Sequence, residues 1–423
     1  MRKLRGWVAA LAATVMAGGA LSATPAVSSQ SEAAAQTVPP VINGPVFNDP
    51  TAPAGSSARR AVIDQLIRLF QSTTPDSEVH LAMHQWMVTE NTSGEDVLSA
   101  LTQARIRGAE IKVIIDSALA EHEETYDRLG IALGNDVTAD SWAMRCPDNR
   151  GCITGGPNVD GAGYLHNKFA LFTNLSVDGT TYRNTVFQSS SNLHDWYINV
   201  SFNDAYTLAT QSAGTPEDQI YNRYRDYFLD LQERAAGSPT DHYYQSYAAG
   251  KYRVGFYPHR KQTSATDDPV RQVLDRINGC EHPGPDGNRY VTRIDFALTH
   301  WTNYRTNIAE KVAELARRGC VITVIIGGEL GTEVEAELRS VPTIDLIVCR
   351  RDGEKPHTKI TMFKGPYNGT PTSRVITGSA NFTQMPRSDD IELELVGDDT
   401  YARYWEWFGQ LYSACTQLPS ASK

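Results

Sequence analysis

The chain contains one pattern of strand and helix signals twice, and this duplication limits the possible folds more than any other feature of the sequence. In the first copy, an apolar strand-like segment is followed by helical spacing, a glycine and a second buried-type strand, at residues 79–86, 94–107, 108 and 111–116. The same order recurs at residues 294–301, 308–318, 319 and 321–326. Strands that alternate with amphipathic helices predict an α/β sheet covered by helices, present twice through domain duplication.

A second pair of matching motifs follows each copy. A His-x-Lys motif and a downstream Ser-x-Asn motif occupy, in the first half, His166, Lys168, Ser190 and Asn192. Both motifs recur together in the second half, at nearly the same interval, as His357, Lys359, Ser379 and Asn381. A lone His-x-Lys is a weak signal, because His259 and Lys261 form one without a following Ser-x-Asn, and we interpret that one as a surface turn. The joint recurrence therefore indicates a functional site.

The residue types in these motifs suit the chemistry of a phosphate group. Side chains alternate along a strand, so the His and Lys of each motif project from one face, and so do the Ser and Asn. Each set then offers a nucleophile or acid/base, a cation and neutral hydrogen-bond donors for an oxyanion. Two sets predict a symmetric pocket between two lobes, in which one imidazole attacks phosphorus while the other protonates the leaving oxygen.

The paired motifs resemble those of the phospholipase D superfamily, and the resemblance extends over residues 57–415. It implies an α/β fold of two fused lobes, each a mixed β-sheet flanked by helices, related by a pseudo-twofold axis with the active site between them. It also implies a covalent phosphohistidine intermediate, with no cofactor and no metal. On this resemblance His166 is the nucleophile, and His357 is the general acid that then activates water. The phosphoryl oxygens are expected to contact two lysines and two asparagines, supported by two serines: Lys168, Lys359, Asn192, Asn381, Ser190 and Ser379.

The sequence departs from the family pattern at the acidic residue that usually follows the motif lysine by five positions. Thr173 and Lys364 stand there instead, so a degenerate, inactive copy is an alternative, although the other catalytic positions are filled in both halves. A carboxylate on Nδ1 of a histidine fixes its tautomer and leaves Nε2 free. We predict that Asp204 and Glu392 have this role, with a plain surface salt bridge as the alternative for each.

Aromatic residues near the motifs are candidates for the wall of a lipid or headgroup site. They are Tyr164, Trp196 and Trp301, for which packing in the core is the alternative interpretation. His80 and His84, in the first strand segment, are expected only to line the sheet.

The first residues have the order of a secretory signal peptide. Three basic residues precede an apolar stretch at residues 7–21, which ends in small residues and is short for a transmembrane anchor, the alternative interpretation. Cleavage near Ala23 removes three positive and no negative charges, which changes the formal charge from −10 to −13. Residues 24–54, rich in Ala, Ser, Pro and Gln, are expected to be flexible. Residues 55–250 and 251–423 are the predicted first and second phospholipase D-like domains.

Six cysteines follow the predicted signal peptide, and an even count in an exported chain favours disulfides. The tight loop from Cys146 to Cys152 is the best candidate for a bridge. The pairing of the other four stays open: Cys280, Cys320, Cys349 and Cys415. A zinc site is the competing interpretation, but the cysteines lack Cys-x-x-Cys spacing.

These features together predict a secreted, extracellular phosphoric diester hydrolase of the phospholipase D type. It would cleave the bond between phosphate and headgroup in phospholipids, and an alcohol could replace water in the second step to give transphosphatidylation. We expect the phospholipid substrate at a membrane or micelle surface, no stable nucleic-acid partner, and a monomer. A secreted nuclease of the same superfamily is the second candidate, but the negative charge makes a flanking basic groove less natural. A non-catalytic binding protein is the third.

Overall fold

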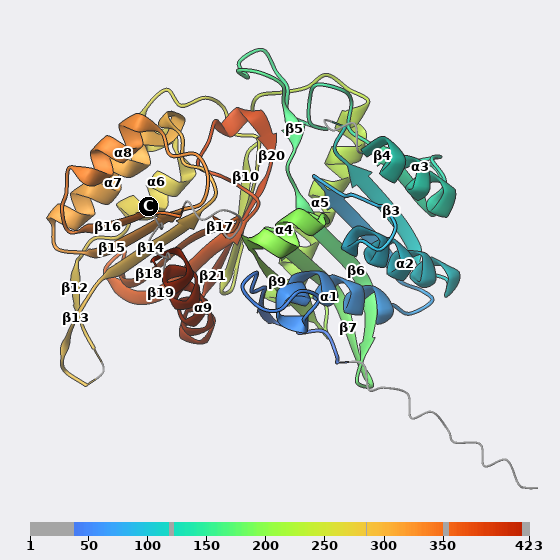
Figure 1. The fold of residues 1–423 in the computed structure, drawn as a ribbon, viewed down its shortest axis with the longest axis horizontal. Helices are drawn as coiled ribbons and strands as arrows, with labels where there is room; N and C mark the ends of the chain where they lie inside the picture. The colour runs from blue at the N-terminus through green and yellow to red at the C-terminus, as the bar shows by residue number, and fades with distance from the viewer. Residues whose placement is uncertain (1–37, 118–121, 285, 350–354, 417–423) are drawn as a thin grey trace, which may run out of the picture. The chain divides into compact units, whose positions relative to one another are not determined.

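Two mixed β-sheets, built from matching strands of the two halves, form the framework of the protein (Figure 1). The computed structural model describes residues 38–117, 122–284, 286–349 and 355–416. The first sheet has seven strands in the order β1-β9-β7-β6-β2-β3-β4. Their bounds are Gly44–Phe47 (β1), Glu78–Met83 (β2), Glu110–Ile115 (β3), Trp142–Arg145 (β4), Lys168–Val177 (β6), Thr180–Ser189 (β7) and Asp204–Thr210 (β9). Strands β2, β3 and β4 pair in parallel, and the other neighbours are antiparallel.

The second sheet has eight strands and repeats this arrangement in the order β10-β11-β21-β19-β18-β14-β15-β16. Their bounds are Gln245–Ala249 (β10), Tyr252–Phe256 (β11), Arg293–Leu298 (β14), Val321–Ile326 (β15), Ile344–Val348 (β16), Lys359–Tyr367 (β18), Thr370–Gly378 (β19) and Ile391–Val396 (β21). Strands β14, β15 and β16 are parallel, as their counterparts β2, β3 and β4 are. The predicted α/β fold with two mixed, helix-flanked sheets is confirmed.

Helices cover both sheets. In the first half they are α1 (Ser57–Gln71), α2 (Ser93–Ile106), α3 (His122–Leu133), α4 (Asp195–Val200) and α5 (Pro216–Ala235). In the second half they are α6 (Pro269–Asp275), α7 (Thr306–Arg317), α8 (Thr332–Arg339) and α9 (Asp398–Thr416), with short 3₁₀ turns at Ala265–Asp267, Asn303–Arg305 and Met385–Arg387. Gly108 and Gly319 follow α2 and α7 with φ of 109° and 97°, a conformation that stops a helix and that glycine adopts without strain.

The hydrophobic core has three main parts. One lies under α1 and α2 in the first half, and another lies under α6, α7 and α8 in the second. The third contains residues of both halves, because α5 packs against strands of both sheets. Within it the rings of Tyr227 on α5 and Phe256 on β11 stack with centroids 4.6 Å apart. The two lobes therefore share buried apolar surface, which fixes the position of one active-site half relative to the other.

Three predicted boundaries differ in the structure. Residues 44–47, within the segment expected to be flexible, form β1 and pair with β9, because the edge of the first sheet offers free backbone groups there. Strand β10 belongs to the second sheet although it precedes residue 251. The first strand of each repeated unit is shorter than predicted. Strand β2 ends at Met83 rather than at residue 86, and β14 ends at Leu298 rather than at residue 301. The predicted signal peptide and residues 24–37 lie outside the described residues.

Three disulfides join the six cysteines: Cys146–Cys152, Cys280–Cys320 and Cys349–Cys415. The predicted bridge between Cys146 and Cys152 is confirmed, and the pairings that the sequence left open are now defined. Within the described part of the chain, no helix is both long and apolar enough to cross a membrane.

Candidate active site

Two short parallel ladders between the halves place the motif histidines. Strand β5 (Tyr164–Leu165) pairs with β20 (Ser388–Asp389), and β17 (Lys355–Pro356) pairs with β8 (Ser201–Phe202). The backbone N–H of His166 then donates to the carbonyl oxygen of Asp389 at 3.0 Å, and that of His357 donates to the carbonyl oxygen of Phe202 at 3.0 Å. Each histidine is thus held in place by the opposite half of the chain.

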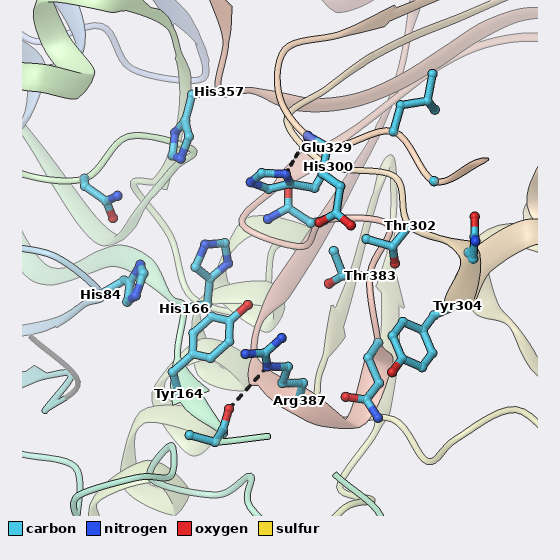
Figure 2. A pocket seen from close by; sticks show the side chains of 18 of the residues that line it. His84, Tyr164, His166, His300, Thr302, Tyr304, Glu329, His357, Thr383 and Arg387 are labelled. Atoms are coloured by element: carbon cyan, nitrogen blue, oxygen red, sulfur yellow. Dashed lines mark hydrogen bonds between the residues drawn. The ribbon is translucent and has the colours of Figure 1, made fainter. Parts of the chain in front are cut away.

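The histidines line a cavity of about 1030 Å³ (Figure 2). The motif residues Asn192 and Asn381 also line this cavity. Its other polar and aromatic lining residues include His84, Tyr164, Tyr197, His300, Thr302, Asn303, Tyr304, Glu329, Thr332, Glu333, Thr383, Gln384 and Arg387. Both copies of the sequence motif therefore contribute to a single cavity, as the duplication predicts.

Asp390 fixes the orientation of His166. Its Oδ1 lies 2.8 Å from Nδ1 of the imidazole, and both side chains are buried. Burial alone would raise the pKa of Asp390, but the charge and hydrogen bond of His166, with the Ser388 hydroxyl, hold that pKa well below its ordinary value. An ionised carboxylate can only accept a hydrogen bond, so Nδ1 carries the proton and Nε2 is free.

A carboxamide takes the equivalent place beside the other histidine. Oδ1 of Asn203 lies 3.0 Å from Nδ1 of His357. Asn203 and Asp390 each stand two residues after a serine, Ser201 or Ser388, so the two halves match here. The two imidazoles therefore present Nε2 to the cavity, but one is paired with a negative charge and the other with a neutral dipole.

Burial favours the neutral form of both imidazoles. It lowers the pKa of His166 to about 4, with a further contribution from the charge of Lys168 and opposition from Asp390. Burial also lowers the pKa of His357 well below its ordinary value, and the charges of Lys359 and Lys168 lower it further. Neutral Nε2 atoms can act as a nucleophile or a base. An anionic phosphate would raise both pKa values by favouring the protonated imidazole.

The motif lysines lie buried beneath the histidines. The Lys168 ammonium donates to the carbonyl oxygen of His166 at 2.6 Å. The Lys359 ammonium donates to the carbonyl oxygen of His357 and, at 3.0 Å, to Oγ1 of Thr299. Burial lowers the pKa of Lys168 to about 7 and that of Lys359 further below its ordinary value. An anion bound above them would restore the charged form.

The motif asparagines have hydrogen-bonding capacity left for a ligand. Within the described residues, Oδ1 of Asn192 and Oδ1 of Asn381 are buried without a hydrogen-bond partner. The serines hold the loops behind them: Ser190 Oγ accepts from the backbone N–H of Asp204 at 3.0 Å, and Ser379 Oγ accepts from that of Ile391 at 3.0 Å. The serines thus contact the strands that follow the histidine partners.

The acids predicted to orient the histidines do not reach them. Asp204 instead accepts hydrogen bonds from Thr358 at 2.5 Å and from Tyr404 at 3.0 Å. Burial raises the pKa of Glu392 to about 7, against the opposing charge of Arg305, and its position on β21 lies opposite Gly255 and Gly378 of the neighbouring strands. The prediction was wrong by one residue in the first half and by two in the second. The true partners come from the opposite half of the chain, which spacing along one half cannot reveal.

The candidate aromatic residues divide between wall and core. Tyr164 lines the cavity, with its ring 5.5 Å from that of His166. Trp301 is fully buried and donates from Nε1 to the carbonyl oxygen of Arg305, so its prediction as a substrate contact is wrong. Trp196 is 43% exposed and lies outside the lining, whereas its neighbour Tyr197 is part of it, 4.5 Å from the ring of His357.

Two further histidines line the cavity and were not predicted to do so. His84 lies with its ring 4.8 Å from that of His166, and its Nε2 is 4.0 Å from Asp116. His300 accepts at Nδ1 from the backbone N–H of Glu329 at 3.0 Å (Figure 2). Both follow the carboxyl end of a central strand, a place where ligand-binding residues gather in α/β sheets, and that position was the available signal. Among the described residues, no group of three or more His, Cys, Asp or Glu side chains is arranged to hold a metal ion.

The residues that replace the family's motif aspartates stand apart from the cavity. Thr173 accepts at Oγ1 from the backbone N–H of Glu78 at 2.7 Å. Lys364 is half exposed and forms an ion pair with Asp398 at 3.4 Å. Neither residue lines the cavity that contains the two motif histidines.

The sheets and the cavity define a two-lobed α/β protein with one motif histidine from each lobe in a common cavity. Similarity to solved structures agrees with this class at the level of fold. Phosphatidylserine synthase from Haemophilus influenzae Rd KW20 matches with a TM-score of 0.53 and 11% sequence identity, covering 89% of this chain and 89% of that one.

Two other solved structures are similar. Polyphosphate kinase from Porphyromonas gingivalis matches with a TM-score of 0.50 and 13% identity over 90% of this chain, which spans 52% of the kinase. NucT from Helicobacter pylori matches with a TM-score of 0.28 and 13% identity, over 43% of this chain and 92% of its own. A scan against models of protein families and a search of curated proteins found no match.

Proposed function

We propose that this protein is a phosphodiesterase that acts by double displacement through a phosphohistidine on His166. The observation that carries the proposal is the pair of imidazoles in one cavity, each held at Nδ1 by an acceptor so that Nε2 is free. The ammonium groups of the two lysines below them, and the Nδ2 groups of Asn192 and Asn381 in the lining, are the proposed donors to the phosphoryl oxygens. Geometry and pKa direction both suit nucleophilic attack.

In the first step, Nε2 of His166 forms a bond to phosphorus and the ester bond to the leaving alcohol breaks. His357, protonated when the anionic substrate binds, transfers its Nε2 proton to the leaving oxygen. In the second step, neutral His357 removes a proton from water as its oxygen attacks phosphorus, and the bond between phosphorus and His166 breaks. Dividing one substitution into two replaces a single difficult step by two easier ones. An alcohol in place of water would give transphosphatidylation.

The two different Nδ1 partners favour this division of roles. Phosphorylation at Nε2 leaves His166 as a cation throughout the lifetime of the intermediate, and the ionised carboxylate of Asp390 stabilises that charge. His357 has the neutral Asn203 as its partner, so its imidazolium is the more acidic of the two and gives up its proton more readily. The reversed assignment would place the long-lived cation beside an uncharged group.

For the substrate we propose a phospholipid, cleaved between phosphate and headgroup. The chain carries a formal charge of −10, which disfavours the long basic groove of a nuclease. The similarity to phosphatidylserine synthase over 89% of both chains supports a lipid substrate over a nucleic acid. We also propose that the protein is exported, because a signal-peptide pattern stands before a domain with three disulfides.

One assay tests both the reaction and the substrate. Purified protein is incubated, with EDTA present, with phosphatidylcholine, with phosphatidylethanolamine and with plasmid DNA, and is compared with His166→Ala and His357→Ala variants. Release of headgroup alcohol that persists in EDTA and is lost in both variants is the expected result. DNA nicking without lipid turnover would indicate that the protein is a nuclease. Absence of turnover on every phosphodiester would indicate a non-catalytic binding protein.

A further inference from the structure

The wall of the cavity contributed by the second half contains a buried amide without a partner. Gln384 is only 4% exposed, lines the cavity, and within the described residues neither Oε1 nor Nε2 has a hydrogen-bond partner. An unpaired buried polar group costs roughly 1–3 kcal/mol, so an amide with both ends unpaired calls for a ligand that pairs with them. Gln384 follows the motif residue Asn381 by three positions, and both residues line the same cavity.

The neighbours of Gln384 are also polar. Figure 2 shows Thr302 and Thr383 close to the Glu329 carboxylate, across the cavity from His84 and Tyr164. Together with Gln384, these residues form what we call the polar wall: Thr302, Glu329, Thr383 and Gln384. Among the described lining residues, the aliphatic side chains are those of Ala162 and Leu330. This lining is poorly suited to acyl chains and well suited to a small polar group.

The polar wall and the proposed general acid line the same cavity, with His300 between them in the chain of contacts. The proposed general acid, His357, is close enough to His300 for the charge of one to lower the pKa of the other. His300 in turn accepts from the backbone N–H of Glu329, a member of the wall. An alcohol that takes the proton of His357 can therefore contact the polar wall, which lines the same cavity.

The hydrogen-bonding pattern of the wall selects among headgroups. Oε1 of the buried Gln384 needs a donor and its Nε2 needs an acceptor, whereas water can satisfy the carboxylate of the exposed Glu329. A trimethylammonium group has neither donors nor acceptors, and a primary ammonium only donates. A hydroxyl both donates and accepts.

We infer that the leaving alcohol is a polyol and that Gln384 determines this specificity by pairing with two of its hydroxyls. This inference rests on the proposed function, because it names the headgroup class for the same site. The preferred substrate would then be a phosphodiester of glycerol or of a cyclic polyol, rather than an ester of choline or ethanolamine.

The test compares phosphatidylglycerol, phosphatidylethanolamine and phosphatidylcholine with the same acyl chains in detergent micelles, with bis(4-nitrophenyl) phosphate as a phosphodiester without a headgroup. We expect kcat/KM to be at least tenfold higher for phosphatidylglycerol than for the other two lipids. Gln384→Met, of similar size, should lower the glycerol-to-choline ratio of kcat/KM at least tenfold. Gln384→Glu should shift preference toward the ethanolamine ester. Gln103→Met, at an exposed position on α2, is the matched control and should leave all rates unchanged.

The possible results test the polyol specificity and the phosphodiesterase activity separately. Turnover of bis(4-nitrophenyl) phosphate without a preference for phosphatidylglycerol, or with a ratio that Gln384→Met does not change, would overturn the inference and leave the proposed function standing. Faster cleavage of a single-stranded oligonucleotide than of any lipid would also overturn it. Absence of turnover on bis(4-nitrophenyl) phosphate would contradict the proposed function itself.

Discussion

Replacing Asp390 by asparagine removes the negative charge beside His166 while keeping the size of the side chain and an acceptor oxygen. The native Oδ1 lies 2.8 Å from Nδ1 of His166, and its second oxygen accepts from Ser388 at 2.5 Å. An asparagine can keep its oxygen toward His166, as Asn203 does beside His357. The variant therefore tests the charge and leaves the tautomer of the imidazole in place.

The size of the effect follows from the geometry. The hydrogen bond places the two charge centres about 4 Å apart, where opposite charges attract by about 4 kcal/mol at an effective dielectric constant near 20. The asparagine retains a dipole that recovers part of this, so the cationic intermediate should lose about 2–3 kcal/mol of stabilisation. That loss corresponds to a fall in kcat of roughly 30- to 150-fold. KM should change little, because the charge on His166 develops only during the reaction.

The assay is steady-state hydrolysis of bis(4-nitrophenyl) phosphate by wild type and Asp390→Asn, with thermal unfolding to verify the fold. Asp226→Asn is the matched control, since its side chain on α5 is half exposed and remote from the cavity. A kcat for Asp390→Asn within threefold of wild type would refute the argument that this carboxylate stabilises the intermediate. An equal fall in kcat for Asp226→Asn would show that the loss comes from removing any negative charge and not from the position of Asp390.

Other variants test the remaining parts of the site. Asn203→Asp places a carboxylate beside His357 and raises its pKa, so the descending limb of the kcat/KM profile should move to higher pH by about one unit. Because His166 has a pKa of about 4 in the folded protein and about 6.5 when unfolded, protonation favours unfolding as the pH falls between these values. The free energy of unfolding, measured by urea titration, should fall between pH 7 and pH 4.5 in both proteins. The fall should be about 2 kcal/mol smaller for His166→Asn than for wild type. Removing the short Cys146–Cys152 bridge by double serine substitution should lower the unfolding free energy by about 2 kcal/mol, measured in the same way.

The repeated pattern allowed the sequence to predict the architecture and the central residues. The positions of Gly108 and Gly319 mark helix ends in both halves, and the histidines of the two His-x-Lys motifs line one cavity. These features are local or periodic, so they can be read along the chain without knowing which segments meet. The loop disulfide of Cys146 followed from the same kind of local spacing.

The histidine partners could not be found in that way, because each comes from the other lobe. Asp390 and His166 are 224 residues apart, and Asn203 and His357 are 154 apart. Two-residue ladders set this pairing, and a shift of one residue exchanges the side chain that reaches the imidazole, as Asp204 beside Asn203 shows. For Trp301 the sequence left a cavity-wall residue and a core residue as alternatives, and its complete burial shows that it belongs to the core.

The central claim is that His166 becomes covalently bound to phosphorus during turnover. Its most direct test is to mix the protein with bis(4-nitrophenyl) phosphate, quench the reaction in base within the first turnover, and map the modified peptide by mass spectrometry. The account predicts a 4-nitrophenyl phosphate adduct on His166, with greater accumulation in a His357→Gln variant, in which attack by water is slowed. An adduct on His357, or product formation in a single turnover with no adduct on any histidine, would contradict it.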